Sequence, residues 1–108
     1  MPTIRFHAVD TAKLLTVSKE MHNRLATIYN IPLDHITLEV IESRFISEET
    51  MILSYPLIEV CAFNREITLE DEVASTISNY LEKAGYPESE VYFHHLASRN
   101  YYANGEHF

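Results

Sequence analysis

The stretch PTIRF at residues 2–6 decides the fold of this chain, because a similar stretch, PLIEV at residues 56–60, occurs fifty-four positions later. Each strand-like stretch runs into a segment whose apolar residues have helical spacing. The segments that follow the two predicted helices also match. Residues 31–38 (IPLDHITL) and residues 86–93 (YPESEVYF) both pass from a proline and an acidic residue into a second strand. The sequence therefore predicts one β-α-β unit that occurs twice.

The two units fit a single domain. The chain has 108 residues, 46% of them apolar, and its two glycines and four prolines are too few for a disordered chain. A chain of this length is long enough for a core and too short to divide. We expect one domain over residues 1–108, with the first unit at 2–43, the second at 56–96, and a C-terminal hairpin or tail at 97–108.

Two right-handed β-α-β units predict an α/β (α+β) fold, in which a four-stranded mixed sheet carries both helices on one face. The same element order also describes the ferredoxin-like fold, in which the two strands of each unit are separated by a strand of the other. Element order alone leaves both folds open.

The first unit has a clear helix and a less regular exit. Asp10 or Thr11 is a suitable N-cap, and apolar residues then recur every three or four positions as far as about Tyr29. After the second strand, residues 43–55 predict a loop with a short hairpin that separates the two units.

The second unit has stronger boundary signals. Thr68 and Asp71 have the spacing of a capping box, and Gly85 stands where a left-handed residue ends a helix. The pair Asn104-Gly105 predicts a two-residue hairpin turn in an aromatic tail. We expect this tail to pack against a neighbouring subunit.

The strand expected at residues 57–63 predicts an oligomer. It is a nearly continuous apolar run, broken only by Glu59, as in a strand that is covered on both sides. Because two helices cover only one face of the sheet, we expect other subunits to cover the second face.

Charge and hydropathy exclude several classes of function. Eight basic and sixteen acidic residues give a net charge of −8, which would repel a nucleic-acid backbone. The sequence has neither an apolar run long enough to cross a membrane nor the start of a signal peptide. We expect a cytoplasmic protein that binds neither nucleic acid nor membranes.

Metal and thiol chemistry have little support in the spacing of the sequence. His94 and His95 are neighbours on a strand and face opposite ways, and the other four histidines show no close ligand spacing. Cys61 lies in an apolar run, so we expect it to pack as a small hydrophobic residue. We expect no metal site and no cofactor.

Pro2 is the residue with the most distinctive chemistry. Removal of Met1 before this small residue would leave a secondary amine at the head of a strand. An α-amino group titrates at about 8, and an apolar surrounding lowers that pKa because it disfavours the charged form. Pro2 would then be a neutral base that moves a proton within a keto-enol system. Proline also begins many strands for purely structural reasons.

With its duplicated β-α-β units, the chain resembles the tautomerase superfamily, which includes oxalocrotonate tautomerase and macrophage migration inhibitory factor. In detail, the resemblance rests on Met1-Pro2 at the entry to a strand and on PESEVYFHH at residues 87–95. It implies a homotrimer with a small-molecule substrate and with Pro2 as the catalytic base. It also suggests an uncharacterised bacterial branch of the superfamily.

The same resemblance implies a set of substrate-binding residues. Tyr92 and His94 match positions that line the site, and they point to the same face of their strand. Superfamily members hold acidic substrates with basic residues, but Ile31 and Thr37 stand at two such positions here. Arg44, just past the second strand, and Lys13, near the position of another superfamily arginine, are the candidate replacements.

Three hypotheses of function follow. The first is a tautomerase or isomerase that acts on a small enolisable keto acid, with Pro2 as general base. The second is a ferredoxin-like module for ligand sensing or oligomerisation. The third is an inactive scaffold with the tautomerase fold, which Ile31 and Thr37 favour because neither residue is basic. We expect Tyr92 and His94 to approach Pro2 across a subunit interface, together with aromatic residues of the tail.

Overall fold

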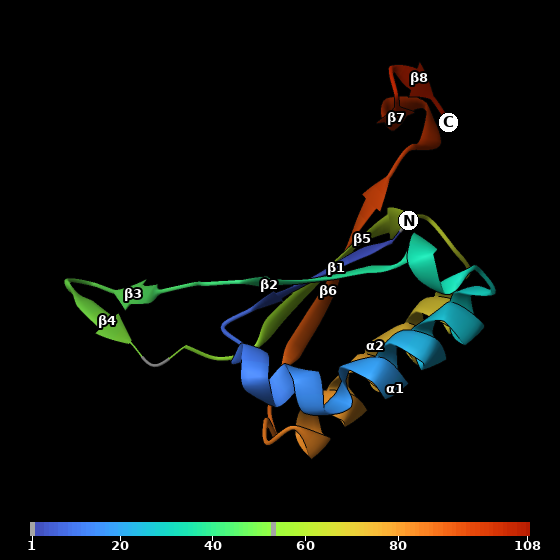
Figure 1. The fold of residues 1–108 in the computed structure, drawn as a ribbon. Coiled ribbons are helices and arrows are strands. Elements are labelled where there is room, and N and C mark those ends of the chain that lie inside the picture. The colour runs from blue at the N-terminus through green and yellow to red at the C-terminus, as the bar shows by residue number, and fades with distance from the viewer. Residues whose placement is uncertain (1, 53) are drawn as a thin grey trace.

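A computed structural model describes residues 2–52 and 54–108. The main sheet and the helix layer consist of six elements, in chain order β1 (Thr3–His7), α1 (Thr11–Tyr29), β2 (Thr37–Ile41), β5 (Leu57–Phe63), α2 (Ile67–Lys83) and β6 (Glu90–Leu96). Figure 1 shows both helices on the same side of the sheet. Neither helix is long and apolar enough to span a membrane.

The strand order of the main sheet is β2-β1-β5-β6. Inside each unit the two strands are direct parallel neighbours, and the units join through the antiparallel pair β1–β5. The predicted fold is therefore confirmed. The ferredoxin-like alternative is wrong, because no strand of one unit lies between the two strands of the other.

The two helices differ in how their ends are capped. At α1, the Asp10 side chain accepts a hydrogen bond from the Lys13 backbone N–H, and Asn30 ends the helix at a φ of 56°. At α2 the predicted capping box is wrong: Thr68 lies inside the helix, and the N-cap is Glu66, whose side chain makes no capping hydrogen bond. Gly85 has a φ of 104°, in agreement with the predicted C-terminal boundary.

The core lies between the sheet and the two helices. Alternate residues of the two central strands point into it, because successive side chains of a strand face opposite ways. The buried core side chains of β1 and β5 are Ile4, Phe6, Ile58, Val60 and Ala62. The helices contribute Leu14, Met21, Leu25, Val73, Ile77 and Leu81.

Two hairpins extend from this body (Figure 1). The predicted hairpin between the units pairs β3 (Phe45–Ser47) with β4 (Thr50–Ile52). The predicted terminal hairpin pairs β7 (Tyr102–Ala103) with β8 (Glu106–His107), around Asn104 and Gly105 at positive φ.

The aromatic tail contacts its own chain through Phe63, and its packing against a neighbouring subunit stays a prediction. The rings of Tyr101 and Phe108 lie 5.8 and 5.9 Å from the ring of Phe63 on β5, centroid to centroid. These contacts hold Tyr101 and Phe108 against the end of β5, and Tyr101 and Thr3 line one hollow.

Candidate functional site

Pro2 lies at the head of β1 and is less than 2% exposed. Its carbonyl oxygen accepts a hydrogen bond of 3.1 Å from the Thr37 backbone N–H. Extending the β1–β5 register by one residue places Pro2 opposite Ala62, which pairs with His95 on β6. Pro2 therefore belongs to the helix-covered face, as Ile4 does two residues later.

A polar group lies on that helix-covered face. His95 Nε2 is 2.7 Å from a carboxylate oxygen of the nearly buried Glu70. The Tyr29 hydroxyl is buried without a hydrogen-bond partner among the described residues. Burial, and secondarily the charge of Glu70, raises the pKa of Tyr29 to about 12, although Arg65 above its ring opposes the shift. This group was not predicted from the sequence, because its members come from three separate elements.

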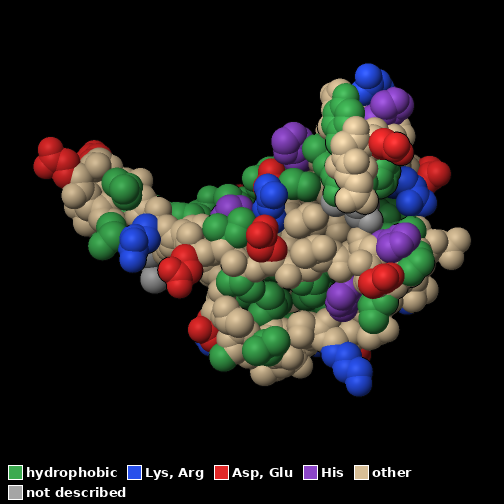
Figure 2. All heavy atoms as spheres, turned by 45° about the horizontal axis from the view of Figure 1, so that its top comes forward, with side chains coloured by type: hydrophobic (Ala, Val, Ile, Leu, Met, Phe, Trp, Pro, Cys, Tyr) green, Lys and Arg blue, Asp and Glu red, His purple; other side chains and the backbone are tan. Residues whose placement is uncertain are grey.

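The uncovered face of the sheet carries charged side chains. This corrects the expectation that the sheet is apolar on both of its faces. Arg5 on β1 contacts Glu39 on β2 at 3.0 Å and Glu59 on β5 at 3.5 Å. Figure 2 shows acidic, basic and histidine side chains interspersed among apolar ones over the visible surface. The apolar run at residues 57–63 wrongly predicted a strand covered on both sides. Its residues alternate between the helix-covered face and the uncovered face.

Tyr92 and His94 meet Glu59 on this uncovered face. The register pairs Glu59 with Tyr92 and Cys61 with His94. His94 Nδ1 is 3.4 Å from Glu59 Oε2, and the Cys61 sulfur lies within 4.8 Å of a carboxylate oxygen of Glu59. The predicted shared face of Tyr92 and His94 is thus present. Spacing along one strand did not predict that their neighbours are Arg5, Glu59 and Cys61.

The side chains around Glu59 shift the pKa values of Glu59, Cys61 and Tyr92. Burial alone would raise the pKa of Glu59, but hydrogen bonds from Cys61 and His94 and the charge of Arg5 outweigh it and lower the pKa. Burial, followed by the negative charge of Glu59, raises the pKa of the Cys61 thiol. The same two causes raise the pKa of Tyr92. Cys61 is therefore buried, as predicted, but it is not in a purely apolar setting.

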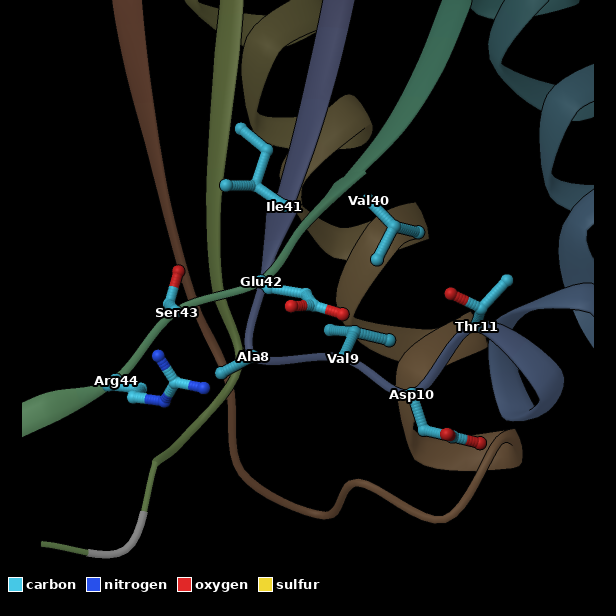
Figure 3. A pocket seen from close by; sticks show the side chains of 9 residues that line it. All are labelled: Ala8, Val9, Asp10, Thr11, Val40, Ile41, Glu42, Ser43 and Arg44. Carbon is cyan, nitrogen blue, oxygen red and sulfur yellow. The ribbon is translucent and has the colours of Figure 1, made fainter.

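Arg44 and Lys13 lie away from Pro2, near the opposite end of β1. Arg44 lines a hollow of about 590 Å³ between the ends of β1 and β2, and Figure 3 shows it beside Ala8, across the hollow from Thr11. The Lys13 ammonium stands 5.1 Å from the centre of the Tyr86 ring. Both residues are near the far end of β1, roughly 20 Å along the strand from Pro2. Within one chain, neither can share a pocket with Pro2.

The arrangement of paired parallel strands and an antiparallel join defines the tautomerase-superfamily fold. A fused 4-OT asymmetric trimer is 10% identical, with a TM-score of 0.81 over 97% of this chain and 94% of that one. A macrophage migration inhibitory factor-like protein from Entamoeba histolytica is also 10% identical, with a TM-score of 0.73 over 99% and 98%. At these identities, the likeness shows the fold alone.

Within this fold, the chain belongs to the family described as domain of unknown function DUF1904, whose model matches residues 1–107. A crystal structure of such a domain from Sebaldella termitidis ATCC 33386 is 26% identical, with a TM-score of 0.90 over 100% of both chains. No curated protein sequence matches the chain.

Proposed function

We propose that this protein is a tautomerase or isomerase that acts on a small enolisable keto acid, with the amine of Pro2 as general base after Met1 has been removed. The observation that carries the proposal is the position of Pro2, which is buried at the head of a central strand. Burial disfavours the charged form of an amine and so favours a neutral base near pH 7.

The chemistry needs one group that takes a proton and returns it. The lone pair of a neutral Pro2 nitrogen would accept a proton from the carbon or oxygen of a keto-enol pair. The resulting ammonium would then return the proton to the other atom, so the reaction needs no net change in protons. A hydrogen-bond donor near the substrate oxygen would stabilise the developing enolate.

The proposed site requires more than one subunit. Arg44 and Lys13 are near the far end of β1 from Pro2, and Tyr92 and His94 point away from the helix-covered face on which Pro2 lies. A homotrimer would let these residues of one subunit approach Pro2 of the next. One structure with this fold is described as an asymmetric trimer, which supports this assembly.

The first test is the variant Pro2→Ala in tag-free protein whose mature N-terminus has been verified by mass spectrometry. We expect kcat/KM for tautomerisation of phenylpyruvate enol to fall by about a hundredfold or more, because a positioned base contributes about that much. Pro32→Ala is the matched control, because Pro32 also lies outside helices and strands, and this variant should retain activity. Full activity in Pro2→Ala would assign the chemistry to another group.

A second preparation tests the amine without changing any side chain. Protein with a tag upstream of Met1 keeps the Pro2 nitrogen in a peptide bond, so it should fold normally and lack activity. Equal rates in the tagged and tag-free proteins would contradict the role of the amine.

The second candidate is a tautomerase-fold scaffold without activity. The specific observation in its favour is that Ile31 packs against the hydrophobic core and Thr37 is a neutral residue of β2, so neither supplies a cation. A tag-free trimer that is inactive on several keto-acid enols would favour this candidate over the enzyme.

A further inference from the structure

We propose that Glu59, Cys61 and His94 form a binding site for a divalent metal ion of the zinc type on the uncovered face of the sheet. Their three potential ligand atoms all lie within 4.8 Å of one another. This inference does not require Pro2 to be a base, although it uses His94, which the proposed function also places near Pro2 of the next subunit.

The β5–β6 register builds this group of ligands. Cys61 and His94 are direct cross-strand partners, and Glu59 is two residues before Cys61, on the same face of β5. Ligands of tetrahedral zinc lie about 3.3–3.8 Å apart, given the usual zinc–sulfur and zinc–nitrogen distances. His94 has a side chain that is 61% exposed, so its ring has room for the adjustment of about 1 Å that closes the site.

The ligand types suit zinc and its close relatives. A thiolate, an imidazole and a carboxylate together match the mixed sulfur, nitrogen and oxygen preference of Zn²⁺ and Co²⁺. On binding, the Cys61 thiol would lose its proton to solvent and the metal would take that proton's place. The charges of Glu59 and the Cys61 thiolate would then neutralise the divalent ion.

Arg5 orients the carboxylate for this role. It contacts Oε1 of Glu59 at 3.5 Å, whereas the other oxygen, Oε2, is the one near His94. The second contact of Arg5, to Glu39 at 3.0 Å, balances its positive charge and lessens its repulsion of a cation. Such outer partners fix the direction of metal ligands and strengthen binding.

Within one chain, the site opens onto a hollow. A hollow of about 300 Å³ is lined by Cys61, His94, Arg5, Thr3 and Tyr101, among others. Three protein ligands leave the fourth tetrahedral position to water or a small anionic ligand from this hollow. A coordination shell of this kind exchanges its outer ligand, in contrast to a closed structural site with four protein ligands.

The test is a titration of reduced, tag-free protein with Co²⁺, followed by competition with Zn²⁺. We expect one equivalent of Co²⁺ per chain and a thiolate-to-cobalt charge-transfer band in the near ultraviolet, which Zn²⁺ abolishes. Cys61→Ser should remove the band, and His94→Gln should weaken binding by about tenfold or more. Because His94 is exposed, this second variant should fold normally even if the buried Cys61 position tolerates no change.

His95→Gln is the matched control, since His95 is the next residue on the same strand and faces the helices. Its affinity for Co²⁺ should equal that of the unmodified protein. Absence of the charge-transfer band in the unmodified protein would overturn the proposal. An undiminished affinity in both Cys61→Ser and His94→Gln would also overturn it, because the ion would then bind elsewhere.

Discussion

The two faces of the same four strands are chemically opposite. On the helix-covered face, Ile4, Phe6, Ile58 and Val60 are fully buried. One residue away along each strand, the uncovered face presents charged and polar groups such as Arg5. A single-residue step along β1 thus separates a side chain that stabilises the fold from one that is available for chemistry.

The comparison also locates the ionisable groups. On the covered face, Tyr29 is a buried phenol whose hydroxyl has no hydrogen-bond partner within residues 2–52 and 54–108. On the uncovered face, the Glu59 side chain is only 14% exposed, but its carboxylate contacts Arg5 on β1 and His94 on β6. The covered face therefore disfavours the charged form of Tyr29, whereas the uncovered face stabilises the charged form of Glu59. We therefore expect Tyr29 to make the fold less stable at alkaline pH and Glu59 to make it less stable at acid pH.

The largest contrast is expected between two adjacent residues of β1. Phe6→Ala should lower the free energy of unfolding by about 3–5 kcal/mol, because it leaves a cavity in the core. Arg5→Ala should have a several-fold smaller effect, because its ion pairs are partly exposed. Urea denaturation of the two variants measures both changes. Similar shifts in the two midpoints would contradict the assignment of the faces.

The covered face should respond to alkali through Tyr29. Its pKa is about 12 in the folded chain and about 10 in the unfolded one, so its contribution to stability is present below pH 10 and is lost as the pH rises toward 12. Tyr29→Phe should make the free energy of unfolding less dependent on pH over that range, by about 2–3 kcal/mol in total. Parallel alkaline profiles for the two proteins would show that Tyr29 ionises as freely as in the unfolded chain.

The uncovered face should respond to acid, with the smallest effect of the three. The pKa of Glu59 is lowered by folding, so its contribution is present above its usual value of 4.5 and is lost as the pH falls through the folded value. Glu59→Gln should destabilise the protein at pH 7 by about 1 kcal/mol and flatten the acid limb of the profile. Thermal unfolding between pH 7 and pH 3 measures this, with Glu88→Gln as a surface control.

The fold was accessible from the sequence because its signals are local. The repeat at residues 2–6 and 56–60 predicted the two units, and Asn104-Gly105 predicted the terminal turn. The capping box at Thr68 failed because the N-cap of α2 is Glu66, two residues earlier, so that Thr68 lies inside the helix and cannot cap it. Short-range spacing thus predicted which elements exist more reliably than it predicted where they begin.

The candidate sites were less accessible, because they depend on pairings between distant segments. Tyr92 and His94 were assigned to one face by their spacing, but their neighbour Cys61 is identified only through the β5–β6 register. Likewise, His95 reaches Glu70 across the layer between sheet and helices. Sequence spacing along a single strand cannot show which residues of another element stand opposite.

The antiparallel join between the two units also governs how the chain must fold. The pairs inside each unit connect residues thirty-three or thirty-four apart, whereas the join pairs Thr3 with Cys61, fifty-eight positions away. Because contacts between distant residues require the closure of longer loops, we expect each unit to form before the join. Loop-closure entropy grows slowly with length, at about 0.6 kcal/mol for each doubling, so the hairpin at residues 45–52 adds little to the cost of bringing the units together.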